Sequence, residues 1–180
     1  PIAVFSHIRP IPTGRNIEDG VTTCLSGDHD GIVALGGGSA LDAGKAIGLI
    51  ARQKCRLWDL EDAGDNDKNA DPDLIAPILA IPTTAGTGSE VGRAGLIVNE
   101  AEQRKVIIFH PKMLPSSVIL DPELTVGLPP HITAATGMDA LTHAVESYLS
   151  KASSASTEEH ATAAVRLIFK YLQRAFDKGD

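Results

Sequence analysis

Short apolar runs bounded by glycine and proline divide the first two thirds of the chain. Residues 31–35 (GIVAL) end at three glycines and residues 78–81 (ILAI) lie between two prolines, so each run predicts a strand buried on both faces. Residues 96–98 and 106–109 flank a polar turn, which predicts a hairpin. Residues 117–120 predict one more strand, closed by Asp-Pro.

One helical pattern lies between these strands, and two more form the end of the chain. Residues 39–52 favour a helix, and after two prolines residues 131–150 and 157–177 favour two more. Two pairs have the spacing of a capping box: Ser39 with Asp42, and Ser156 with Glu159. This order predicts an α/β domain over residues 1–128 and the start of a helical domain over residues 129–180.

Acidic residues are concentrated in one segment. The 180 residues carry a net charge of −7, and residues 59–73 hold seven acidic side chains against Lys68. Without an apolar period, this segment predicts a solvated loop, and its spacing does not fit a calcium loop. The acidic balance and the small number of aromatic residues argue against a nucleic-acid partner. No apolar run is long enough for a membrane span.

The cysteines and the first residue add two expectations. Cys24 and Cys55 are too few for a disulfide framework, which favours a reducing, cytoplasmic location. The chain starts at Pro1 rather than Met, so we expect it to be a piece of a longer protein.

A glycine turn follows the first predicted strand and opens a helix. Residues 36–39 (GGGS) bring backbone N–H groups and a helix N-terminus to one place, an arrangement typical of phosphate binding. The P-loop pattern fails, because Ala46 follows Lys45, and the GxGxxG pattern fails at Leu41. A tight turn with no ligand therefore stays open as an alternative.

A second loop, residues 82–90 (PTTAGTGSE), follows the next buried strand with four hydroxyl groups and two glycines. In a parallel sheet both loops lie at the carboxyl edge, where ligands bind. An ordinary polar turn is the alternative.

Asp139 and His143 are four residues apart and share one helix face, almost opposite an apolar stripe. The stripe contains Ala134, Met138, Leu141, Val145 and Tyr148. The pair is either an exposed ion pair or two ligands of a divalent metal. No later histidine has a suitable position, so the chain holds half a metal site at best.

Together these motifs resemble those of the iron-dependent (group III) alcohol dehydrogenase family. The similar stretches are GGGS with Asp42 and Lys45, PTTAGTGSE, DPELTVGLPP at 121–130, and GMDALTHAVE at 137–146. The resemblance covers nearly the whole chain, and it implies that the chain is a central fragment of a member of this family. It implies a Rossmann-like α/β domain that binds NAD or NADP, followed by the first helices of an all-helical domain that holds Fe²⁺, Zn²⁺ or another divalent metal.

The resemblance also implies roles for particular residues. The cofactor-binding residues would be Gly37, Gly38, Ser39, Asp42, Thr83, Thr84, Thr87, Ser89 and Lys105. Asp139 and His143 would be the first two metal ligands, completed in the family by two histidines that this chain does not contain. No residue is expected to act as a catalytic nucleophile.

The function implied by the resemblance is hydride transfer between NAD(P) and a small alcohol or aldehyde, in a homo-oligomer. Two alternatives remain. One is a relative of the same fold, similar to glycerol dehydrogenase or maleylacetate reductase. The other is a truncated, inactive nucleotide-binding module that lacks a complete metal site.

Overall fold

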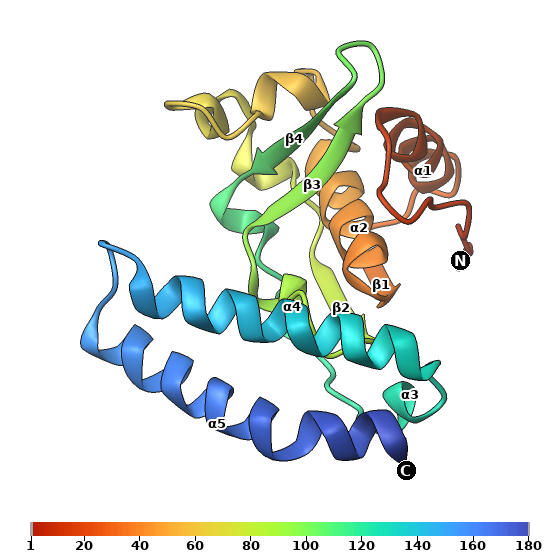
Figure 1. Ribbon diagram of the computed structural model, residues 1–180. Helices are drawn as coiled ribbons and strands as arrows, with labels where there is room; N and C mark the ends of the chain where they lie inside the picture. The colour runs from red at the N-terminus through yellow and green to blue at the C-terminus, as the bar shows by residue number, and fades with distance from the viewer. Residues whose placement is uncertain (1, 180) are drawn as a thin grey trace. The chain divides into compact units, whose positions relative to one another are not determined.

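The computed structural model describes residues 2–179, which form two compact units (Figure 1). The first unit contains residues up to 82 together with residues 89–120. The second contains residues 83–88 together with the chain from residue 121 onward. The α/β class predicted from the sequence is confirmed for the first unit, and helices follow it in the second.

The first unit contains two small sheets. Its strands are β1 (Ile32–Gly36), β2 (Ile78–Pro82), β3 (Ala94–Asn99), β4 (Arg104–Phe109) and β5 (Ser117–Val118). Among the described residues β1, β2 and β5 form a parallel sheet in the order β1-β2-β5, and β3 pairs antiparallel with β4. The register places Gly36 opposite Pro82, so the chain leaves β1 and β2 at the same sheet edge. The predicted hairpin is confirmed, but the last strand ends at Val118 rather than Leu120.

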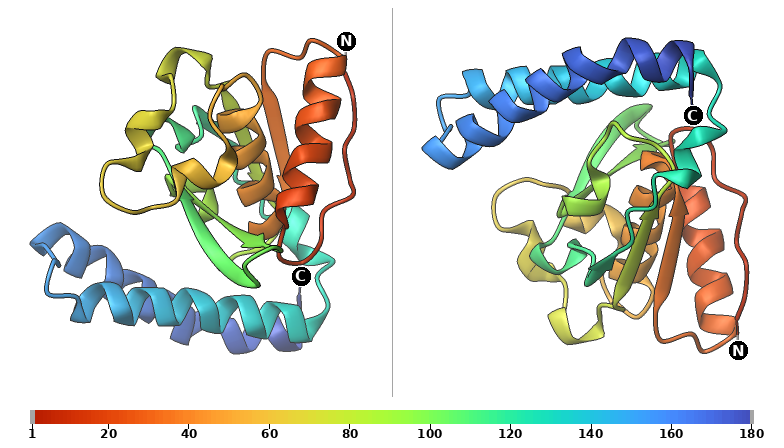
Figure 2. Two further views of the ribbon diagram at one scale, coloured as in Figure 1. Left: turned by 90° about the horizontal axis from the view of Figure 1, so that it is seen from above. Right: turned by 90° about the horizontal axis from the view of Figure 1, so that it is seen from below.

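Helix α2 (Gly38–Ile50) is the centre of the first unit (Figures 1 and 2). On one side it packs so closely on the parallel sheet that a Cβ added at Gly44 would lie 2.6 Å from the Cβ of Ala34. On the other side it shares a core with the β3–β4 hairpin through Ile97 and Val106. This two-sided burial explains why α2 is apolar almost all round its circumference.

Helix α1 (Gly14–Ser26) was not predicted from the sequence. Thr13 caps it, and the side chain of Asn16 completes a capping box. The buried face contains Gly14, Ile17, Gly20 and Cys24, most of them small, so hydrophobicity alone does not reveal the helix. The indole ring of Trp58 occupies the space that a side chain at position 14 would need.

The acidic segment is more ordered than a solvated loop. It contains three 3₁₀ turns: η1 (Leu57–Leu60), η2 (Asn66–Asn69) and η3 (Pro72–Leu74). Leu60 and Ala70 are buried in the main core. Arg104 of β4 holds the segment through two hydrogen bonds to the Glu61 carboxylate, at 2.6 and 2.7 Å, and these bonds lower the pKa of Glu61.

The second unit is mainly a pair of antiparallel helices. It contains α3 (Glu123–Val126), α4 (Pro130–Leu149) and α5 (Ala155–Asp177). Gly137 and Ala144 of α4 and Ala161 of α5 are buried, and Gly137 lies against Leu172 of α5. None of the helices described is long and apolar enough to cross a membrane.

Both predicted capping boxes are wrong. Gly37 is the N-cap of α2, and the carboxylate of Asp42 is bound to groups outside the helix. Ser154, not Ser156, caps α5 by accepting a hydrogen bond from the backbone N–H of Thr157. A correct spacing is therefore not sufficient, because the chain can start a helix two residues earlier or use the acid elsewhere.

Candidate functional site

The glycine turn presents an accessible helix N-terminus. Gly36 has a φ of +146°, a conformation that favours glycine, and a Cβ there would lie 2.7 Å from the Cβ of Ala40. Gly37 is the N-cap of α2 and offers no side-chain oxygen to the first N–H groups. Gly37, Gly38 and Ser39 are all half-buried, and the Ser39 hydroxyl donates to the carbonyl oxygen of Pro10. Such an end can bind an anionic phosphate.

Asp42 links α2 to the segment after residues 83–88, the part of the second predicted loop that we call the threonine–glycine loop. Its Oδ1 accepts a hydrogen bond from the hydroxyl of Ser89 at 2.5 Å, and its Oδ2 accepts one from the backbone N–H of Leu96 at 3.0 Å. The structure thus brings two of the predicted cofactor residues, Asp42 and Ser89, into direct contact with each other.

Lys45, to which the resemblance assigns no role, is buried in the middle of α2. Its side chain is 1% exposed, and its Nζ lies 3.3 Å from Asp42 Oδ1 and donates to the carbonyl oxygen of Ser89 at 2.9 Å. Burial lowers the pKa of Lys45, while the nearby Asp42 carboxylate raises it. The signal in the sequence was a lysine three residues after Asp42 in a largely apolar helix, which points to a specific buried partner.

The threonine–glycine loop belongs to the second unit. Thr83 and Thr84 are half-buried, and Thr87 is exposed. Gly86 lies against α4, where an added Cβ would be 2.8 Å from both the carbonyl oxygen and the Cβ of Thr136. The loop is therefore packed on α4 one turn before Asp139.

Lys105 lies on the exposed face of the β3–β4 hairpin. It pairs with Val98 across the two strands and is exposed, while the next residue, Val106, points into the core. An exposed ammonium group is a suitable ligand for a phosphate or a hydroxyl group.

Asp139 and His143 lie together on α4, as their spacing predicts. The His143 Nε2 and Asp139 Oδ1 are 3.7 Å apart, and the side chains are 51% and 43% exposed. Two donors bound about 2.1 Å from a tetrahedral metal are about 3.4 Å apart, so a small rotation suffices for both to hold one ion. One oxygen and one imidazole nitrogen are suitable ligands for Fe²⁺ or Zn²⁺.

The pair is not a complete metal site. Within residues 2–179, no three His, Cys, Asp or Glu side chains come close enough to share a metal ion. The residues present therefore fit two positions of a coordination sphere and leave the remaining positions open.

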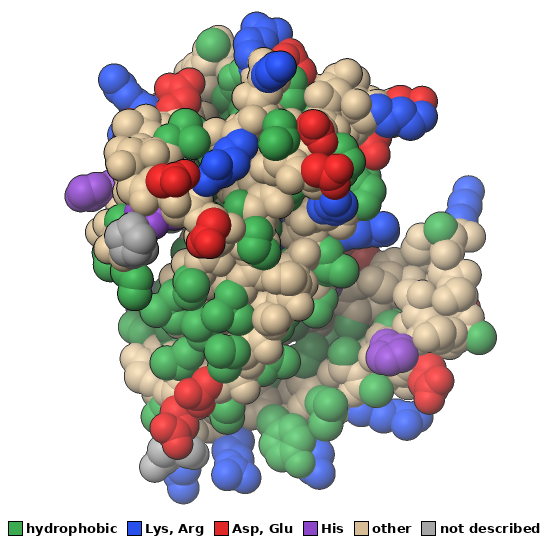
Figure 3. Space-filling view, turned by 180° about the vertical axis from the view of Figure 1, so that it is seen from behind, with side chains coloured by type: hydrophobic (Ala, Val, Ile, Leu, Met, Phe, Trp, Pro, Cys, Tyr) green, Lys and Arg blue, Asp and Glu red, His purple; other side chains and the backbone are tan. Residues whose placement is uncertain are grey.

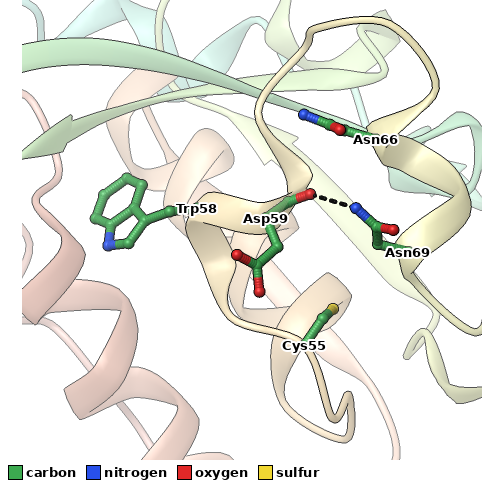
Figure 4. Close-up of a pocket in the computed structure, with 5 residues that line it drawn as sticks. All are labelled: Cys55, Trp58, Asp59, Asn66 and Asn69. Carbon is green, nitrogen blue, oxygen red and sulfur yellow. Dashed lines mark hydrogen bonds between the residues drawn. The ribbon is translucent and has the colours of Figure 1, made fainter.

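A separate open pocket of about 510 Å³ lies in the first unit, beside η1 and η2 (Figure 4). Its lining contains Cys55, Trp58, Asp59, Asn66 and Asn69. Most of its polar groups already have partners: Asn69 donates to the carbonyl oxygen of Asp59 at 2.9 Å, and Arg56 binds the Asp59 carboxylate and lowers its pKa. None of the predicted cofactor residues lines this pocket, which we assign to the local structure of the acidic segment.

Comparison with known families gives a consistent result over both units. Residues 1–122 match the family described as "Iron-containing alcohol dehydrogenase", and residues 133–180 match "Fe-containing alcohol dehydrogenase family, C-terminal".

Individual relatives are similar over almost the whole chain. Alcohol dehydrogenase 4 of Schizosaccharomyces pombe is 41% identical over 178 residues, which are 99% of this chain and 41% of the relative. The NAD-dependent methanol dehydrogenase of Bacillus methanolicus is 37% identical over 179 residues, which are 99% of this chain and 46% of the relative. The chain thus spans less than half the length of these relatives.

Solved structures agree with the fold. The crystal structure of a 1,3-propanediol oxidoreductase superimposes with a TM-score of 0.91 at 40% identity, covering 99% of this chain and 45% of that one. The structure of sulfoacetaldehyde reductase from Bifidobacterium kashiwanohense in complex with NAD⁺ superimposes with a TM-score of 0.91 at 36% identity. The match covers 98% of this chain and 46% of that one.

Proposed function

The chain belongs to the iron-containing alcohol dehydrogenase family, and from this premise we propose that the protein is an NAD(P)- and divalent-metal-dependent alcohol dehydrogenase. The observation that carries the proposal is the accessible N-terminus of α2 behind the glycine turn, which is suited to a pyrophosphate. The NAD⁺ complex of one similar structure and the NAD dependence of one relative support it.

In this proposal the first unit supplies the cofactor contacts. The backbone N–H groups of Gly37, Gly38 and Ser39 hold the pyrophosphate, and Lys105 adds a positive charge from β4. Asp42 and Ser89 contribute through their mutual hydrogen bond, which fixes the chain just after the threonine–glycine loop. Either NAD or NADP fits these contacts.

The second unit supplies the reacting end. Thr83, Thr84 and Thr87 offer hydroxyl groups to the nicotinamide, and Asp139 and His143 hold Fe²⁺, Zn²⁺ or another divalent metal. When bound, the nicotinamide supplies a hydride acceptor, and the metal supplies a positive charge that polarises the substrate oxygen. The protein then has only to orient the groups and exclude water, so no nucleophilic side chain is required.

The substrate class and the cellular setting complete the proposal. Similar proteins are described as methanol, 1-propanol and 1,3-propanediol dehydrogenases, so we propose a small alcohol or its aldehyde as substrate. Cys24 and Cys55 are both free, in keeping with the reducing cytoplasm. A homo-oligomer is proposed. The two-ligand site leads us to expect no turnover from the 180-residue chain alone.

Metal-ligand substitutions test this proposal. Asp139→Ala and His143→Ala should each abolish metal-dependent alcohol oxidation in the purified full-length protein, because either change leaves one ligand on α4. Glu159→Ala and His160→Ala are matched controls, since both residues are exposed on α5, and they should keep wild-type activity. Turnover is followed as NADH absorbance with Fe²⁺ or Zn²⁺ added.

The outcomes separate the candidate functions. Near-normal turnover in the metal-depleted Asp139→Ala or His143→Ala protein would refute the metal assignment. Tight NADH binding by the wild type without any metal-dependent turnover would favour an inactive nucleotide-binding module instead.

A further inference from the structure

Lys45 occupies an unusual position for a lysine, in the middle of the most buried helix of the first unit. Its side chain is 1% exposed, with the apolar residues Ala43, Ala46 and Leu49 on the same helix fully buried. Taking an ammonium group out of water is costly unless the group is fully hydrogen-bonded. The contacts of Nζ therefore indicate what the charge is used for.

The ammonium group of Lys45 binds the backbone of a single short segment. It donates to the carbonyl oxygens of Ser89 at 2.9 Å, of Gly92 at 3.5 Å, and of Ala94. Its charge is balanced by Asp42, 3.3 Å away, and by the nearby Glu90. The three carbonyl oxygens use all three N–H groups of a protonated lysine, so the charged form is the one that fits.

Asp42, one turn earlier on α2, binds the same segment through a hydroxyl group and a backbone N–H group of that segment. It accepts hydrogen bonds from the hydroxyl of Ser89 and from the backbone N–H of Leu96. One turn of α2 thus fixes residues 89–96 at both ends, over η4 (Ser89–Val91) and the start of β3.

This segment follows the threonine–glycine loop without an intervening residue. The loop ends at Gly88, which has a φ of +65°, and Ser89 is the first residue held by α2. The N-terminus of α2 is the glycine turn. A single rigid helix therefore carries the proposed pyrophosphate contacts at its start and fixes the end of the proposed nicotinamide loop from its middle.

We propose that Lys45 is a positioning residue for the nicotinamide cofactor: it ties the backbone of residues 89–94 to α2 and so sets where the threonine–glycine loop ends. This inference rests on the proposed function. Lys45 itself touches no cofactor, because its three N–H groups are used within the protein. Its substitution should change cofactor affinity through the loop, beyond any loss of stability.

The experiment compares Lys45→Met with two controls in the purified full-length protein. Lys54→Met makes the same change at an exposed lysine, and Ile17→Ala destabilises the same core from α1. The readouts are the NADH dissociation constant by fluorescence titration, the KM for NAD⁺ against the KM for alcohol, and hydrogen exchange of residues 89–94. Lys45→Gln, which keeps two N–H donors, is included in case Lys45→Met does not fold.

The inference predicts that Lys45→Met weakens NADH binding about tenfold or more, equivalent to about 1.4 kcal/mol of binding free energy, because the displaced loop loses contacts with the cofactor. The KM for NAD⁺ should rise more than the KM for alcohol, exchange of residues 89–94 should quicken, and Lys45→Gln should be intermediate. Both controls should bind NADH like the wild type.

Two results would overturn it. Folded Lys45→Met or Lys45→Gln protein that binds NADH as tightly as Ile17→Ala would show that Lys45 serves stability alone. Weakened binding with unchanged exchange of residues 89–94 would exclude action through this segment. Failure of the wild type to bind NADH is a different outcome, because it refutes the proposed function and with it the premise of the inference.

Discussion

At the scale of single residues, the candidate site depends on places where a backbone approaches another element closely. Gly36 turns the chain into α2 at a positive φ, and Gly86 lets the threonine–glycine loop lie against Thr136. At Gly86 the obstacle is partly backbone, the carbonyl oxygen of α4, which cannot rotate away as a side chain can. The position of the loop is therefore sensitive to a single added methyl group.

Substitution of Gly86 tests this contact. Gly86→Val should displace the loop from α4 and destabilise the second unit by about 1–3 kcal/mol, the usual effect of overpacking. Alcohol oxidation should fall at the same time, because the hydroxyls of Thr84 and Thr87 move with the loop. Thermal unfolding and turnover measure the two effects. Gly127→Ala is the control, since an added Cβ there meets no atom within 4 Å and its φ is −81°; equal behaviour of the two variants would contradict the expectation.

At the scale of elements, short 3₁₀ turns complete the hairpin and the acidic segment. One of them, η5 (Pro111–Met113), follows β4 and is capped by His110, whose Nδ1 accepts a hydrogen bond from the backbone N–H of Lys112 at 3.0 Å. An acceptor nitrogen must be unprotonated, so the cap requires neutral histidine. Burial lowers the pKa of His110, Lys112 lowers it further, and Asp67 opposes the shift.

This cap predicts a pH dependence of stability. A histidine whose pKa is lowered on folding binds a proton more readily in the unfolded state, so its contribution is complete above the ordinary value of 6.5 and is lost as the pH falls toward the lowered value. The loss is at most about 1.4 kcal/mol per pH unit.

Asn at position 110 can accept the same hydrogen bond but does not titrate. His110→Asn should therefore remove part of the decline in stability below pH 6.5, measured by urea unfolding at several pH values. Parallel curves for both proteins would show that His110 is not responsible.

At the scale of the whole molecule, each unit leaves apolar side chains in contact with water. Val33 and Leu35 of β1 are 64% and 58% exposed on the sheet face opposite α2, and Phe169 of α5 is 75% exposed. The apolar stripe of α4 is also open, with Met138 and Tyr148 about half exposed. Figure 3 shows hydrophobic side chains gathered on the face seen from behind. Surfaces of this kind favour association.

The 180-residue chain studied alone should therefore self-associate. We expect a rising weight-average mass with concentration in sedimentation experiments, together with binding of a hydrophobic dye. Phe169→Ser combined with Leu167→Ser should weaken the association through the helices after Pro130, and Glu159→Ser should not. A well-dispersed monomer that binds no dye would contradict this expectation.

The sequence by itself located the strands, helices α2, α4 and α5, and the residues of the motifs. Apolar runs between glycine and proline located β1, β2 and the β3–β4 hairpin, because apolar runs and chain breaks are local properties. The predicted burial of β1 on both faces is wrong, since Val33 and Leu35 are exposed. The i, i+4 spacing placed Asp139 and His143 on one face of α4 for the same reason. The motif order indicated the family, which the comparisons confirmed. The assignments of individual cofactor and metal residues remain predictions.

Only the tertiary structure decided how polar side chains are used. The spacing of Asp42 suggests a helix cap, yet its carboxylate binds Ser89 and Leu96, 47 and 54 residues away. The partners of Lys45 lie on a segment that packing alone brings to α2, and α1 is hidden in the sequence because its buried face consists largely of small residues. The sequence specifies local propensity. A buried charge needs a partner, and that partner is decided by which distant segments the core brings together.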